Sequence, residues 1–362
     1  MKRVFRMLIA LLVVLPLAAL LVYSMQARAL SQRLSAEAQQ LDARRFELAG
    51  SEDGNLVECL ALASDIGPDV SFSLPMRGDA VRHAITNAPE FAQDTAARDE
   101  ARRIGSWLDN TLHCARLRTV APTSGIGVFP DLLNRRRQTM PRTMESLAAL
   151  VPMSMRELLL TTRADEALEQ CAATLTLTTA WLRLEGLESE LATLGPTNTV
   201  MPICREAFIA ATPGARLRFT ARIHELITLT PDFSEVMRIE RVQLSLRHYG
   251  AWIAPDIAAT FPEQARLAID KQHGERWARG ITTTLALRAY WKQFDRGMRE
   301  LETVSALPAP QRERDLERAQ KQLEAPFLWR FIPAAPVDLK YQLYSPYADR
   351  LRDDLRGLIV EP

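Results

Sequence analysis

The first residues that could do chemistry are His224 and Glu225, a neighbouring pair in a stretch predicted to be helical. A zinc protease carries a second histidine four residues after the first, because both rings must reach one metal ion. Thr228 stands at that position, so the pair predicts no metal site. Gly125 and Gly127 likewise lack the third glycine of a dinucleotide-binding loop. We therefore assign no catalytic, cofactor-binding or metal-binding residue from local motifs.

A second candidate pair is His113 and Cys114, since a thiol beside an imidazole can act as a nucleophile. Adjacent residues on a helix point about 100 degrees apart, so the ring is poorly placed to take the proton of the thiol. A disulfide is the simpler role for Cys114 in a protein exported to an oxidising compartment.

The chain contains four cysteines, which are Cys59, Cys114, Cys171 and Cys204. No two of them have the spacing of two to four residues that structural zinc sites commonly show. An even number of cysteines in an exported protein is typical of a disulfide framework, so we predict two disulfides. Three pairings are open. Pairing in sequence order closes the shortest loops.

Pairing in sequence order has a geometric requirement. If residues 165–194 formed one straight helix, Cys171 would lie about 35 Å from the far end of that helix. Cys204 could then reach Cys171 only if the chain turned back earlier. Gly186 is the residue at which the helix could break.

The elements that must position these residues are mostly helical. Apolar residues recur at spacings of three and four over much of residues 51–304, most clearly at Phe294, Met298 and Leu301. We predict an all-α domain there, a multi-helix bundle with irregular loops and little or no sheet. It could be divided into two subdomains, 51–160 and 161–304.

Several helix boundaries can be predicted from local signals. Ser154 and Glu157 have the spacing of a capping box that opens a helix, and so do Asp232 and Glu235. Residues 94–118 are predicted to form one helix. Residues 164–194 are predicted to form the longest helix of the middle region. Gly195-Pro196, which follows, predicts a firm end to that helix.

The N-terminal residues predict a membrane anchor. Residues 1–6 are basic and are expected to stay in the cytoplasm, and residues 7–27 contain no charge. At about 1.5 Å per residue, that helix would span roughly 30 Å, the thickness of the hydrocarbon core. The alternative is a cleaved signal peptide, with small residues at Ala27 and Ala29 around the cut. Both readings place the bulk of the chain in the periplasm of a bacterium, and the first holds it in the inner membrane as a single-pass protein.

Residues 28–50 are expected to continue out of the membrane as a helical stalk. Leu34, Leu41 and Leu48 recur at intervals of seven, which is a weak coiled-coil pattern. The stalk could therefore mediate self-association, or it could pack on its own domain.

Residues 305–362 are predicted to be a linker, a charged helix and an aromatic C-terminal segment. Five large apolar residues of that segment could contact the membrane interface, where tryptophan is enriched. They are Phe327, Leu328, Trp329, Phe331 and Ile332. The alternative is that this segment packs on the core.

The net charge of +1 at pH 7 gives no electrostatic footprint for nucleic acid. The anchor, the helical composition and the absence of a local catalytic motif favour an interaction or scaffold component of the cell envelope with protein partners, rather than an enzyme. Two alternatives stay open. One is an enzyme whose active site is assembled from distant helices, and the other is a ligand-binding periplasmic domain.

Overall fold

The computed structural model describes residues 14–18, 21–22, 25, 28–29, 32–33, 36, 46–48, 52–56, 59–60, 81–120, 137–185, 187–253, 281–324 and 349–359. Most of these residues are helical, which confirms the predicted fold class. In this part of the chain, no helix has the length and apolar composition needed to cross a bilayer. The aromatic residues between 327 and 332 lie outside the described residues.

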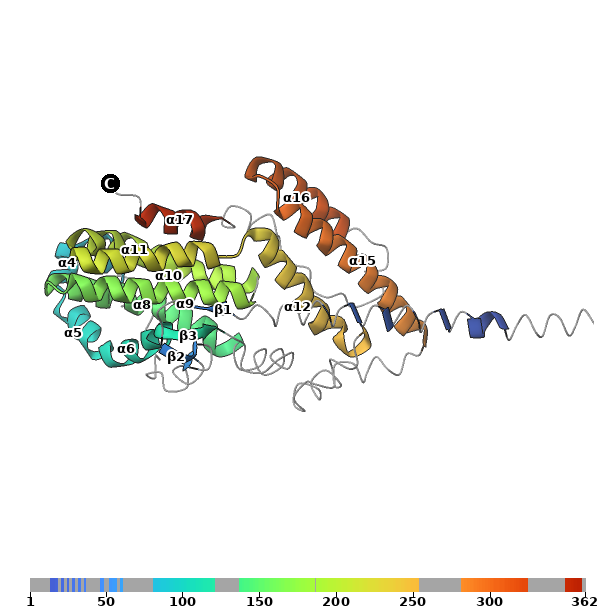
Figure 1. Cartoon of the computed structure of the whole chain (residues 1–362), viewed down its shortest axis with the longest axis horizontal. Coiled ribbons are helices and arrows are strands. Elements are labelled where there is room, and N and C mark those ends of the chain that lie inside the picture. The colour runs from blue at the N-terminus through green and yellow to red at the C-terminus, as the bar shows by residue number, and fades with distance from the viewer. Residues whose placement is uncertain are drawn as a thin grey trace, which may run out of the picture.

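Four long helices form a bundle at the left of Figure 1. They are α8 (Arg137–Leu160), α9 (Ala164–Glu185), α10 (Leu187–Ala210) and α11 (Pro213–Leu229). Helix α10 packs along both α8 and α9, and α11 packs against α9. The core between them is aliphatic and includes Val151, Leu175, Ile203 and Ile223, all with no exposed surface.

The disulfide Cys171–Cys204 joins α9 to α10, with 5.8 Å between the two Cα atoms. This is the pairing in sequence order, and it meets its geometric requirement. Helix α9 ends at Glu185 and α10 begins at Leu187, so the chain changes helix at the predicted place and returns along α9.

The predicted helix end at Gly195-Pro196 is wrong, because α10 continues through both Pro196 and Pro202. Each proline removes one backbone hydrogen bond from the helix. However, Pro196 and Thr197 are buried, and α10 packs on two neighbouring helices and is tied to α9 by Cys204. This tertiary packing outweighs the local preference for a break.

The capping box predicted at Ser154 is also wrong, since α8 runs without interruption from Arg137 to Leu160. Ser154 and Glu157 lie inside the helix and are each 6% exposed. Instead of capping a helix, the Glu157 carboxylate accepts hydrogen bonds from Arg98 and Arg102 on a neighbouring helix. The capping-box pattern was misleading because a glutamate can serve either as a cap residue or as the partner of a buried ion pair.

Three short helices wrap one end of the bundle (Figure 1). They are α4 (Ala88–Gln93), α5 (Thr95–Arg103) and α6 (Gly105–His113), followed by the 3-10 turn η1 (Cys114–Arg116) and strand β3 (Leu117–Val120). The predicted single helix over 94–118 is therefore wrong, because the chain is divided into α5 and α6 at Ile104 and leaves α-helix after His113. Cys114 is bonded to Cys59, with 5.5 Å between the Cα atoms. The helix therefore ends where the Cys59–Cys114 disulfide and the pairing of β3 with its neighbouring strands hold the chain.

Strand β3 is the centre of a small sheet. It pairs antiparallel with β1 (Phe46–Glu47) and parallel with β2 (Glu52–Asn55). The predicted helical stalk is therefore wrong at its C-terminal end, because Phe46 and Glu47 are in a strand. Leu48 is 1% exposed, and its backbone N–H donates to the carbonyl of Arg118 at 2.8 Å. Residues 46–48 are therefore not helical, because burial of Leu48 and pairing with the distant strand β3 favour an extended backbone there.

Helix α12 (Phe233–Ile253) leads away from the bundle. Helix α15 (Ile281–Ser305) packs on α12, and α16 (Ala309–Glu324) packs on α15 (Figure 1). The predicted cap is confirmed, since Asp232 accepts a hydrogen bond from the Glu235 N–H at 2.8 Å. The predicted stripe of α15 is confirmed as well. Phe294, Met298 and Leu301 are all at most 1% exposed.

Arg241 ties α12 to α15 through buried charges. Its side chain is 2% exposed and lies 3.2 Å from the Asp295 carboxylate and 3.1 Å from that of Glu302. Asp295 also accepts from Arg299 at 2.9 Å. A charge removed from water in this way is stable only while its partners remain.

The last helix, α17 (Arg350–Ile359), lies along α11 (Figure 1). It buries Leu351, Leu355 and Leu358, as its amphipathic pattern predicts. The Arg352 guanidinium donates to the Thr230 carbonyl at 2.6 Å, so this end of the chain is held by polar contacts as well.

The Glu157 ion pairs predict a pH effect on stability. Burial raises the pKa of this carboxyl. The hydrogen bonds from Arg98 and Arg102 and the charges of these two residues together lower the pKa by more than burial raises it, so it lies below its usual value of 4.5. The stabilisation is therefore complete above pH 4.5 and is lost as the pH falls through the lowered pKa. Glu157→Gln should reduce the unfolding free energy at pH 7 by about 1–3 kcal/mol. Urea denaturation from pH 7 to pH 3 should show a shallower decline for the variant, and parallel declines would contradict this role.

Candidate functional site

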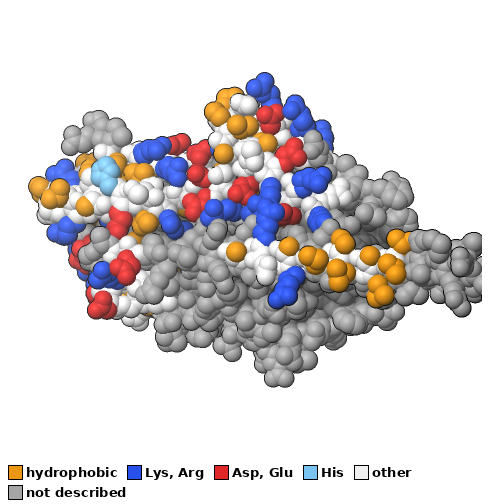
Figure 2. Space-filling view, turned by 45° about the vertical axis from the view of Figure 1, so that its right-hand side comes forward, with side chains coloured by type: hydrophobic (Ala, Val, Ile, Leu, Met, Phe, Trp, Pro, Cys, Tyr) orange, Lys and Arg blue, Asp and Glu red, His pale blue; other side chains and the backbone are white. Residues whose placement is uncertain are grey.

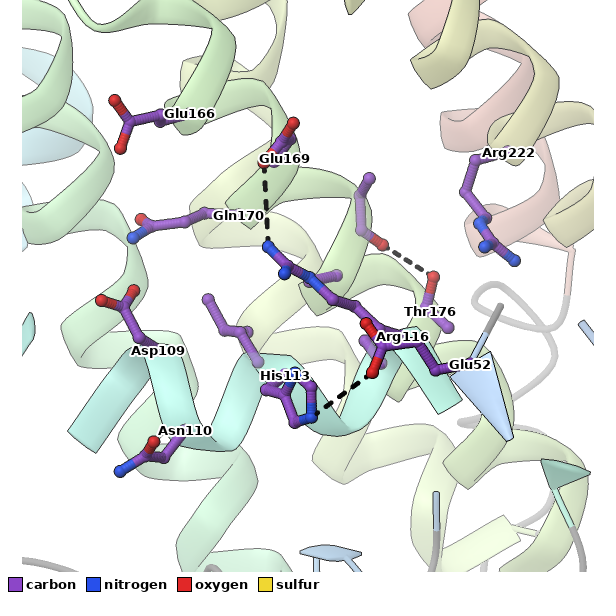
Figure 3. A pocket seen from close by; sticks show the side chains of 14 residues that line it. Glu52, Asp109, Asn110, His113, Arg116, Glu166, Glu169, Gln170, Thr176 and Arg222 are labelled. Atoms are coloured by element: carbon purple, nitrogen blue, oxygen red, sulfur yellow. Dashed lines mark hydrogen bonds and ion pairs between the residues drawn. The ribbon is translucent and has the colours of Figure 1, made fainter. Parts of the chain in front are cut away.

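A cavity of about 870 Å³ lies between the α6–η1 segment and the first half of α9 (Figure 3). Helix α11 contributes Arg222 and strand β2 contributes Glu52 at its border. We call this cavity the α6–α9 cleft. Its volume falls in the range of pockets that hold small molecules.

Small residues form the floor of the α6–α9 cleft. Ala115 and Thr176 are buried, and Ala172 and Ala173 are half-buried. The Thr176 hydroxyl donates to the carbonyl of Ala172 at 2.8 Å and is therefore satisfied within its own helix. Since none of these side chains extends far from the backbone, the two walls can enclose an open space.

Each wall of the cleft contains one half of a disulfide. Cys114 stands between the lining residues His113 and Ala115, and Cys171 stands between the lining residues Gln170 and Ala172. The lining residues on α6–η1 and on α9 are therefore next to covalent cross-links. Both walls are fixed before any ligand enters, which lowers the entropy lost on binding.

One end of the cleft is acidic. Glu166 pairs with Arg163 through both carboxylate oxygens, with 2.6 Å between Arg163 Nε and Oε1. Asp109 on the facing helix interacts with the same guanidinium over a longer range. Figure 3 shows the ends of Glu166, Gln170 and Asp109 on the same side of the cleft. Two carboxylates and one guanidinium leave a net negative charge there.

The other end of the cleft is basic. Arg116 of η1 and Arg218 of α11 each approach Glu169, and both nitrogen–oxygen distances are 3.9 Å. These distances are longer than hydrogen bonds, so both pairs are loose. The two guanidiniums outnumber the one carboxylate that both of them approach, and we call this the basic end. Glu52 at the border, and Asp165, which interacts with Arg218 over a longer range, offset part of the positive charge.

Two further polar groups at the border have partners. Arg222 contacts Glu225 at 2.6 Å, and His113 lies 3.9 Å from Glu52. Among the described residues, no three histidine, cysteine or acidic side chains are grouped to hold a metal ion.

The geometry of the cleft favours binding over catalysis. The side chains of Glu52, Glu166 and Glu169 are 51% to 59% exposed, so water reaches each of these carboxylates. Acid–base and electrostatic catalysis are strongest where water is excluded. Opposite charges at two ends of a fixed cavity are instead suited to orienting a dipolar ligand.

The sequence analysis found the four cysteines of this region but not the cleft between them. A local signal was present, because Glu166, Glu169, Gln170 and Ala173 have the spacing of one helix face. Nothing local, however, places that face opposite Asp109 and Arg116. No protein-family model, curated protein or solved structure matches this chain at a significant level, so the role of the cleft is argued from its own geometry.

Proposed function

We propose that the protein is a membrane-anchored interaction component of the bacterial cell envelope, with its helical domain in the periplasm. One observation carries the proposal: large apolar side chains within the predicted anchor are exposed. Six of them are 52% to 66% exposed, namely Val14, Leu15, Leu17, Leu21, Val22 and Met25. Hydrophobic surface gathers along this N-terminal segment (Figure 2).

Exposed apolar surface of this extent is unfavourable in water, at roughly 25 cal/mol per Å². A lipid bilayer is an environment in which a helix that exposes such side chains is stable. The two disulfides support a location of the helical domain on the periplasmic side of the membrane, because disulfides persist in oxidising compartments such as the periplasm.

A second exposed apolar region supports contact with a protein partner. Leu160, Ile209 and Leu217 are 38%, 67% and 74% exposed. They lie at the end of the bundle where α8 and α10 finish and α11 begins. Apolar side chains that gather at one place on a surface are typical of interaction sites.

The anchor is tested by Leu17→Arg, with Leu217→Arg as the matched control. Both leucines are exposed, but only Leu17 lies in the predicted anchor. A charge in the middle of a membrane helix costs about 2.5–3.5 kcal/mol, which is roughly a hundredfold in partitioning. In cell fractionation with an alkaline wash, the wild type and Leu217→Arg should stay in the membrane pellet and Leu17→Arg should shift to the supernatant.

Release of the wild-type protein by the alkaline wash would contradict the anchor. The interaction role has its own test, which is chemical cross-linking in membranes followed by purification in detergent. The wild type should be recovered in a cross-linked complex that Leu217→Arg weakens. Recovery of the wild type as a monomer alone would contradict the interaction role.

A ligand-binding domain is the second candidate function, and the α6–α9 cleft is the specific observation that favours it. The two functions are compatible, because the anchor segment and the cleft are made by different residues.

A further inference from the structure

The α6–α9 cleft has an acidic end and a basic end, and its walls are fixed by disulfides. We propose that it binds a short zwitterionic peptide, with the peptide amino group at Asp109 and the peptide carboxylate at Arg116. This inference rests on the second candidate function and is independent of the membrane anchor.

The acidic end has unused capacity to accept hydrogen bonds. Among the described residues, Asp109 has no hydrogen-bond or ion-pair partner at contact distance. The guanidinium of Arg163 pairs with Glu166 and interacts with Asp109 only over a longer range. Gln170 Oε1 is buried and accepts no hydrogen bond from the described residues. A protonated amine offers three N–H donors and one positive charge, so it matches both the orphaned acceptor and the charge.

The basic end has unused capacity to bind an anion. Arg116 is 63% exposed and Arg218 is 68% exposed, and their common partner Glu169 is 3.9 Å from each. A guanidinium binds a carboxylate best through two parallel hydrogen bonds, which neither arginine makes with Glu169. A ligand carboxylate would therefore give Arg116 a better partner than it has in the empty cleft.

The distance between the two ends sets the length of the ligand. Asp109 and Arg116 are seven positions apart along α6 and η1, so their backbone positions are separated by about 10 Å at the helical rise. The charges of a free amino acid are much closer than this. Three extended residues span about 10 Å, at 3.3–3.6 Å each. The alanine-rich floor leaves room for small side chains, so trialanine is the simplest matching probe.

Calorimetric titration of the full-length, oxidised protein in detergent tests the proposal. Trialanine should bind, whereas N-acetyl-trialanine, trialanine amide and free alanine should each bind at least about tenfold more weakly. Each blocked peptide loses one charge-assisted interaction, and alanine is too short to reach both ends. The absence of trialanine binding, or equal affinity for the blocked peptides, would overturn the proposal.

Two variants assign the ends of the peptide, and a third is the control. Asp109→Asn should bring trialanine and N-acetyl-trialanine to within about twofold of each other. Arg116→Gln should do the same for trialanine and its amide. Arg118→Gln removes an exposed arginine that pairs with Glu47 outside the cleft and should change neither ratio. All three residues are exposed, so circular dichroism should show a folded protein in each case. Discrimination that survives in both cleft variants would overturn the assignment.

Discussion

Replacing both Cys171 and Cys204 by serine is expected to lower the unfolding free energy by about 3–4 kcal/mol. The disulfide closes a loop with a sequence separation of 33, and the chain-entropy model gives this magnitude for a loop of that length. Both cysteines have no exposed surface, so the new hydroxyls would be buried between α9 and α10 and would add to the loss. Few single changes in a domain of this size should be as damaging.

Urea denaturation of the oxidised proteins measures the effect of the double serine variant. Wild-type protein in reductant provides the reference for the buried hydroxyls, although it also loses Cys59–Cys114. The oxidised variant should retain that second disulfide and should unfold between the oxidised and the reduced wild type. An unfolding free energy within about 0.5 kcal/mol of the oxidised wild type would show that α9 and α10 do not need the cross-link.

The same variant should weaken peptide binding, because Gln170 and Ala172 flank Cys171 in the wall of the α6–α9 cleft. Without the cross-link, part of the binding energy must be spent on ordering that wall. Calorimetric titration with trialanine, below the unfolding transition of the variant, separates this effect from a loss of folded protein.

Arg241→Met is expected to be the most damaging change to a single ion-pair network, at about 3–5 kcal/mol. Methionine keeps most of the apolar stem, so the loss comes mainly from the charge. Among the described residues, Asp295, whose side chain is 10% exposed, would keep its contact with Arg299 alone, and Glu302 would lose its contact with the guanidinium. An incompletely paired carboxylate in this setting is costly, because water cannot replace the missing donor.

The control for Arg241→Met is Arg356→Met, in an ion pair whose partners are 57% and 65% exposed. An exposed pair contributes about 0–1 kcal/mol, so the control should unfold close to the wild type. Adding Asp295→Asn to Arg241→Met should recover part of the loss, since the second change removes the stranded charge. If Arg241→Met loses no more stability than Arg356→Met, α12 and α15 are held together by their apolar contacts alone.

The features that depend on neighbours within one turn of helix could be predicted from the amino acids alone. The stripe of Phe294, Met298 and Leu301 has the spacing of one helix face, and all three residues are buried. Asp232 caps α12 through the N–H three residues later. The number of disulfides could be predicted from the cysteine count, but three pairings stayed open, and the structure shows the one in sequence order.

Other local signals failed because packing between distant parts of the chain overruled them. The preference of a cap or a proline break is worth about 1–3 kcal/mol, and burial of a helix face along two neighbours exceeds it. This is why α8 runs through Ser154 and α10 runs through Pro196. The α6–α9 cleft depends on the same kind of contact. Asp109 and Glu166 are 57 positions apart in the printed sequence, and they share one cavity only because α6 and α9 pack together.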